Sequence, residues 1–144
     1  YLVSQALGAA GAAFYCVLIH GANFPVPEIA FDVASIVRAF LVESTFSFIL
    51  CSIILHVQYS KQKDNDFYGF AVGMAYVAAS LCVGGLSGGI FNPAAASGLI
   101  VVRCLTTYCT PVLHLWVYWA GSVVGAIFAS IIYIAVNNSH EVTA

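Results

Sequence analysis

The chain has 144 residues, of which 62% are hydrophobic and only 7% are charged, and its formal net charge is −2. Soluble domains carry about 25% charged residues, so this chain has too little charge to cover a soluble fold, and lipid is its expected solvent. The slight negative charge provides no basic face, so nucleic acid is not an expected partner.

Four apolar runs have about the 20 residues that a helix needs to cross a bilayer. They cover residues 1–19, 39–57, 68–86 and 113–136. Each is expected to be a helix, because a helix satisfies all its backbone groups within one segment. Since the chain opens directly inside an apolar run, we expect residue 1 to lie within a longer protein or at the start of its ordered part.

Small residues recur at helical spacing in the first and last runs. They are Gly8, Ala9, Gly11, Ala12 and Ala13 in the first, and Gly121, Gly125 and Ala129 in the last. Such residues let membrane helices approach closely, either at one fixed partner or in general packing.

One acidic residue, Glu43, lies inside the second run. An ionisable group at membrane depth is costly and marks a functional or structural site by default. A proton relay is one interpretation, but the sequence places no second acid at that depth, so a relay has little support.

The connections predict an orientation in the membrane. The segment "QYSKQKDND" after the second run holds Lys61 and Lys63, although Asp64 and Asp66 dilute their charge. By the positive-inside rule this loop faces the cytoplasm. Residues 21–35 and the segment around residue 90 then enter from the opposite side, and the tail "NNSHEVTA" is cytoplasmic.

A fifth apolar segment, residues 90–102, is too short to cross. At about 1.5 Å per residue it reaches roughly 20 Å, against about 30 Å of hydrocarbon. Asn92 is a good N-cap and Pro93 fits the first helical position. The sequence therefore predicts a re-entrant half-helix that starts at Asn92 inside the membrane, with the Asn92 side chain facing a cavity.

The backbone just before Asn92 is expected to provide a row of carbonyl acceptors. These are the carbonyls of Gly88, Gly89, Ile90 and Phe91. Non-helical backbone at membrane depth is tolerated where protein or a water-filled cavity meets it. The half-helix adds free N–H groups and a positive partial charge, and the Asn92 amide adds a donor. This combination suits a polar, uncharged permeant and repels cations.

Nothing in the sequence indicates an enzyme, a cofactor or a metal site. No nucleophile–base pair, paired carboxylates or phosphate loop is visible, and the histidines are scattered at His20, His56, His114 and His140. Three cysteines, Cys16, Cys51 and Cys82, lie in apolar runs where a thiol usually packs. Cys104 and Cys109 share one short loop and can form a disulfide if that side is oxidising.

Four segments resemble the aquaporin, or major intrinsic protein, family, in the family's order. "SGGIFNPAAASG" resembles the second Asn-Pro-Ala loop, and "YLVSQALGAAGAAFY" is similar to the third membrane helix. "LVESTFSFIL" resembles the fourth helix with its embedded Glu, and "LHLWVYWAGSVVGAIFASIIY" resembles the sixth.

The resemblance implies an all-α membrane protein, a right-handed bundle of six tilted helices and two half-helices built as an inverted repeat. In such a bundle two Asn-Pro-Ala loops meet at the midplane, and four subunits form a tetramer. Residues 1–144 would form one partial domain with four spans and one half-helix, lacking the first two helices and the first loop. The resemblance implies that Asn92, Pro93 and Ala94 line the pore. It also implies that Glu43, and similarly Gln5, support the loop, with Glu43 accepting hydrogen bonds from backbone N–H groups just before Asn92.

The chain departs from the family at its selectivity filter. Ala95 stands where the family places an arginine, Ser80 where strict water channels carry a histidine, and Gly89 is the third filter position. Arg103 lies too far along the half-helix to replace the arginine. The small residues resemble the looser vacuolar-type channels, whereas Tyr118 and Trp119 resemble the water-channel pattern. We expect a wider filter that admits solutes larger than water.

Two functions remain open at this stage. The first is a passive channel for water or small neutral solutes, embedded in membrane lipid as a homotetramer. The rival is a non-conducting, aquaporin-like structural subunit of a larger assembly with other membrane subunits. A secondary transporter also uses half-helix sites, but it needs coupling groups, and Glu43 alone gives it thin support.

Overall fold

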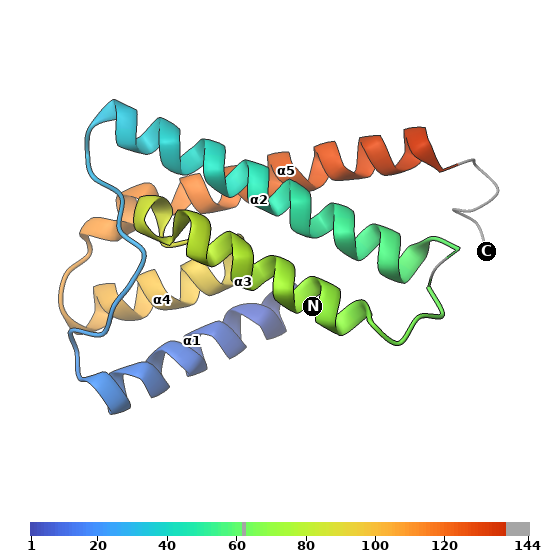
Figure 1. Cartoon of the computed structure of the whole chain (residues 1–144). Coiled ribbons are helices and arrows are strands. Elements are labelled where there is room, and N and C mark those ends of the chain that lie inside the picture. The colour runs from blue at the N-terminus through green and yellow to red at the C-terminus, as the bar shows by residue number, and fades with distance from the viewer. Residues whose placement is uncertain (62, 138–144) are drawn as a thin grey trace.

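The computed structural model describes residues 1–61 and 63–137, which form five α-helices and one short 3-10 helix with no strand among them (Figure 1). The elements are α1 (Leu2–His20), α2 (Val33–Tyr59), α3 (Tyr68–Ser87), α4 (Pro93–Thr106), η1 (Thr110–His114) and α5 (Leu115–Val136). Four segments are long and apolar enough to cross a membrane, the last combining η1 and α5, whereas α4 is shorter. The predicted all-α class and the four spans with one half-helix are therefore confirmed.

Two helices begin at different residues from those predicted. α2 starts at Val33 rather than residue 39, because Asp32 caps it by accepting a hydrogen bond from the Ser35 backbone N–H at 2.9 Å. Hydrogen bonds from Ser35 also lower the pKa of the Asp32 carboxyl. The last run was expected to start at residue 113, but η1, with Pro111 in its first turn, precedes α5. Hydropathy located the spans, whereas caps and a proline set their ends.

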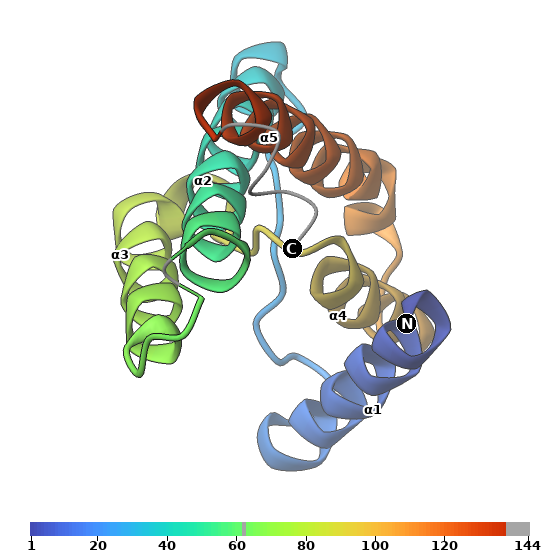
Figure 2. The same ribbon diagram turned by 90° about the vertical axis from the view of Figure 1, so that its right-hand side faces the viewer.

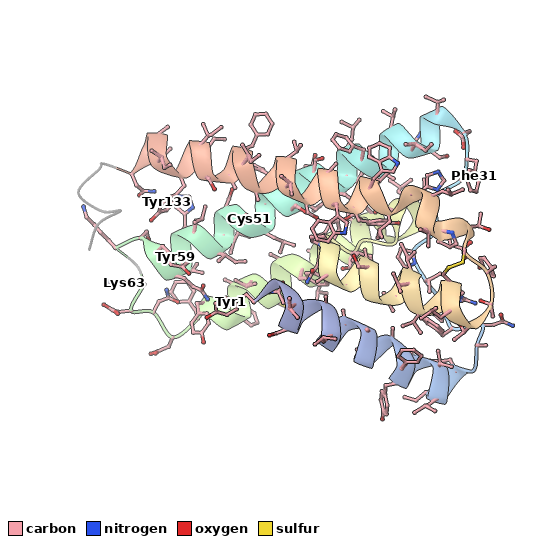
Figure 3. All side chains as sticks on the ribbon, turned by 180° about the vertical axis from the view of Figure 1, so that it is seen from behind. Tyr1, Phe31, Cys51, Tyr59, Lys63 and Tyr133 are labelled. Carbon is pink, nitrogen blue, oxygen red and sulfur yellow. A yellow bond between two sulfur atoms is a disulfide. The ribbon has the colours of Figure 1, made fainter. Side chains whose placement is uncertain are left out.

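The helices form two groups (Figure 2). α2 lies along α5 and also packs against α3, while α1 packs against α4. The connection from α1 to α2 and the loop from α3 to α4 join the two groups. Figure 3 shows Lys63 at one end of the bundle and Phe31 at the other. The lysine loop and the α1–α2 connection thus lie at opposite ends, as the predicted orientation requires, while residues 138–144 of the tail lie outside the described part.

Glycines bring helix backbones into contact within both groups. A Cβ added at Gly98 would lie 2.5 Å from the carbonyl carbon of Ala9, where α4 meets α1. A Cβ at Gly125 would lie 2.4 Å from the Ser44 carbonyl oxygen, where α5 meets α2. In contrast, a Cβ at Gly8 or Gly11 would meet nothing within 4 Å. Close packing therefore uses the small residues of α5 as expected, but Ala9 rather than the glycines of α1.

Replacing either contact glycine by alanine should destabilise the fold. We expect Gly98→Ala and Gly125→Ala each to lower the free energy of unfolding by about 1–3 kcal/mol, the usual cost of overpacking. Thermal unfolding in detergent measures this, with Gly73→Ala in α3 as the control because its Cβ would meet nothing within 4 Å. Equal melting of all three variants would show that these helices are not held at backbone contact.

Candidate pore loop and half-helix

The loop between α3 and α4 has an unusual backbone. Gly88 (φ 92°), Gly89 (φ 63°) and Phe91 (φ 48°) all lie in the left-handed region. Gly88 ends α3, where its N–H donates to the Gly84 carbonyl, and a Cβ there would lie 2.8 Å from the Cβ of Pro27. Phe91 is the one non-glycine residue with positive φ in the described part of the chain. This strain requires a compensating interaction.

Glu43 of α2 provides that interaction. Its side chain is fully buried. Oε1 accepts hydrogen bonds from the Ser87 hydroxyl at 2.6 Å and the Ile90 N–H at 3.2 Å, and Oε2 accepts one from the Phe91 N–H at 2.8 Å. The carboxylate thus makes the backbone contacts expected of it, and three donors satisfy a charge that would otherwise be costly to bury.

Ser87 and Tyr118 extend this network, and sequence reasoning gave neither a role in it. The Ser87 hydroxyl also accepts from the Gly89 N–H at 3.2 Å, and the Tyr118 hydroxyl of α5 donates to the Ser87 carbonyl at 2.6 Å. Tyr118 is 1% exposed. A buried tyrosine hydroxyl usually has a hydrogen-bond partner, so the sequence could indicate that Tyr118 needs one. It could not identify that partner as Ser87, which lies 31 residues away.

The N–H groups of Ile90 and Phe91 point toward Glu43, so the loop presents carbonyls on its other side. Two of them contact hydroxyls of α3: Ile90 O accepts from Tyr76 at 2.9 Å, and Gly89 O accepts from Ser80 at 3.3 Å. Each carbonyl oxygen has a second lone pair, so both can still accept a further hydrogen bond. The Ser80 contact also brings together two of the three predicted filter residues.

Asn92 caps α4 as predicted. Its Oδ1 accepts from the backbone N–H groups of Ala94 at 3.0 Å and Ala95 at 3.4 Å, and Pro93 is the first helical residue. The Asn92 side chain is exposed, and its NH2 group makes no hydrogen bond within the described residues. Ala94 is buried and Ala95 half-buried. A free amide donor therefore stands at the positive end of the half-helix.

Gln5 does not support the loop, in contrast to the expectation. Its side chain is exposed on α1 and makes no hydrogen bond in the described part of the chain. The reason is the pairing of the helices, since α1 packs against α4, whereas the loop is held from α2, α3 and α5.

Arg103 lies in the last turn of α4, at the opposite end of the helix from Asn92. Its buried side chain donates to the Ala22 carbonyl at 3.0 Å, and its guanidinium lies 4.9 Å from the ring centre of Phe24 and 5.2 Å from that of Tyr108. Tyr108 in turn donates to Glu28, which raises the pKa of the Tyr108 hydroxyl. Arg103 thus fastens the α1–α2 connection and takes no filter position.

A disulfide joins Cys104 and Cys109 near this end, the pairing that the sequence allowed. Cys16, Cys51 and Cys82 are free thiols. No group of three or more His, Cys, Asp or Glu side chains suited to a metal ion occurs among the residues described, and His140 lies outside them.

Comparison with known proteins decides the family. The Major intrinsic protein family profile matches residues 1–133. The chain belongs to this family. It is 31% identical over 140 residues to Aquaporin A of Dictyostelium discoideum, and this alignment covers 92% of this chain and 48% of that protein. It is 30% identical over 135 residues to Probable aquaporin NIP7-1 of Arabidopsis thaliana, covering 92% and 46%. Glycerol uptake facilitator protein-like 6 of Lactiplantibacillus plantarum is 32% identical over 92 residues, covering 64% and 41%.

Membership of the major intrinsic protein family confirms the resemblance and makes the chain an integral, multi-pass membrane protein. The chain spans about half the length of the curated relatives it matches.

Replacing Glu43 by glutamine should loosen the pore loop. An amide offers one acceptor oxygen, so at least one of the three donors bonded to Glu43 loses its partner, at about 1–3 kcal/mol. We expect Glu43→Gln to lower the melting temperature in detergent. Asp66→Asn, at an exposed acid near the lysine loop, is the matched control. A Glu43→Gln protein that melts with the wild type would contradict the anchoring role.

Proposed function

We propose that this chain forms part of a membrane channel that conducts water and small neutral solutes passively, past the half-helix α4. One observation carries the proposal. The Asn92 amide, exposed and with its NH2 unbonded, stands at the N-terminus of a short helix beside the carbonyls of Gly89 and Ile90. The names of relatives, aquaporins and a glycerol uptake facilitator-like protein, support it.

The arrangement offers a small neutral molecule both kinds of hydrogen bond. A water oxygen accepts from the Asn92 NH2, and water hydrogens bond to the loop carbonyls. The N-terminal end of the α4 helix dipole carries about half a positive charge, which repels cations. No covalent bond is made or broken in this process, so we assign no catalytic residue.

The proposed filter is wide at the positions this chain supplies. Ser80, Gly89 and Ala95 are small, and none carries a charge. Without an arginine the permeant loses a fixed multi-donor site, so selectivity depends on the helix dipole, the Asn92 amide and the width of the path. We place Asn92 at the midplane of the membrane, and four copies of the complete protein in a tetramer.

Liposome swelling of the full-length protein tests this function. We expect fast flux of water and measurable flux of urea. Ala95→Arg should reduce urea flux more than water flux, because the long side chain narrows the path and adds charge where Ala95 now leaves room. The matched control is Ala95→Ser, which changes the same position but adds little volume and no charge.

Three results would contradict parts of the proposal. Equal effects of Ala95→Arg on both fluxes would show that Ala95 does not line the filter. Fast water flux with urea excluded in the wild type would show that other residues restore the constriction. No flux of either solute would favour the non-conducting structural subunit.

A further inference from the structure

Two hydroxyls of α3 contact consecutive carbonyls of the pore loop. Tyr76 and Ser80 are four residues apart and so lie on the same face of the helix. Ser80 donates to Gly89 O, and Tyr76 donates to Ile90 O at 2.9 Å. The two contacts follow the loop toward Asn92, so Tyr76 lies one helical turn beyond the filter position Ser80.

The Tyr76 ring is held at two points. Its hydroxyl is bonded to Ile90 O, and its ring meets the Phe91 ring edge-on, with 5.9 Å between the ring centres. The side chain nevertheless remains 39% exposed. A bulky, fixed ring therefore projects beside the carbonyls that a permeant would use, next to three filter positions that carry almost no bulk.

We propose that Tyr76 sets the upper size limit for solutes. This inference rests on the proposed channel function and specifies its substrate class. The ring narrows the path beside Ile90, one turn past the wide filter, so that water passes freely, urea more slowly, and a larger polyol such as glycerol is held back. The hydroxyl oxygen, which donates to Ile90 O, keeps its lone pairs to accept from a passing molecule.

The test compares glycerol and water flux in liposomes that contain the full-length protein at equal density. Tyr76→Val removes the ring and should raise the ratio of glycerol to water flux by about tenfold or more, the discrimination that a pocket gains from a small change in volume. Tyr76→Phe keeps the ring and its contact with Phe91, so its ratio should stay close to the wild-type value.

Phe70→Val is the matched control. Phe70 is also an aromatic residue of α3, is 74% exposed, and lies about 120° around the helix from Tyr76. It should leave the flux ratio unchanged. A rise in Phe70→Val equal to that in Tyr76→Val would show a general loosening of α3 and would overturn the inference.

The remaining outcomes separate this inference from the channel function. Water flux with an unchanged ratio in Tyr76→Val overturns the inference and leaves the channel intact. A full rise in Tyr76→Phe also overturns it, because the hydroxyl rather than the ring would then discriminate. A silent wild type with a conducting Tyr76→Val overturns the stated size limit, because the ring would then block water as well as glycerol. No flux in either protein overturns both.

Discussion

The loop between α3 and α4 depends on the hydrogen bonds that it donates to the carboxylate of Glu43. A left-handed conformation at Phe91 costs about 1–2 kcal/mol. A hydrogen bond to a charged group contributes about 1.5–3 kcal/mol, and Glu43 accepts bonds from both Ile90 and Phe91. The bonds therefore offset the strain. They also fix a direction, because N–H groups that point to Glu43 leave the carbonyls on the opposite side.

The carboxylate in turn depends on close helix packing. A Cβ at Gly121 would lie 3.0 Å from the Cβ of Glu43, so α5 covers the acid with almost no intervening side chain. Three residues before Gly121, the Tyr118 hydroxyl donates to the Ser87 carbonyl, and the Ser87 hydroxyl donates to Glu43. The α2–α5 contact and the loop thus form one unit, in which Gly121 of α5 leaves the space that the Glu43 side chain of α2 occupies.

The sequence predicted the parts of this unit that local chemistry decides. An Asn-Pro step in a short apolar segment specifies a capped half-helix, and an acid in a span requires donors, so Asn92 and Glu43 could be found. Ser87 and Tyr118 could not be paired, because their contact joins two helices whose packing sequence pattern does not fix. The expected support of the loop by Gln5 was not found for the same reason, because the pairing of α1 with α4 determines where the Gln5 side chain points.

The two ends of α4 have separate tasks. Arg103 lies in the last turn, where its charge offsets the negative end of the helix dipole and its side chain fastens the α1–α2 connection. The positive end carries no fixed charge, since Ala95 follows Asn92-Pro93-Ala94, and the Asn92 amide is its donor. In the channel that we propose, backbone dipoles alone would repel cations at this end. In the same proposed channel, width is the property that separates neutral solutes of different size, and on α3 the bulk that contacts the loop is Tyr76 rather than Ser80.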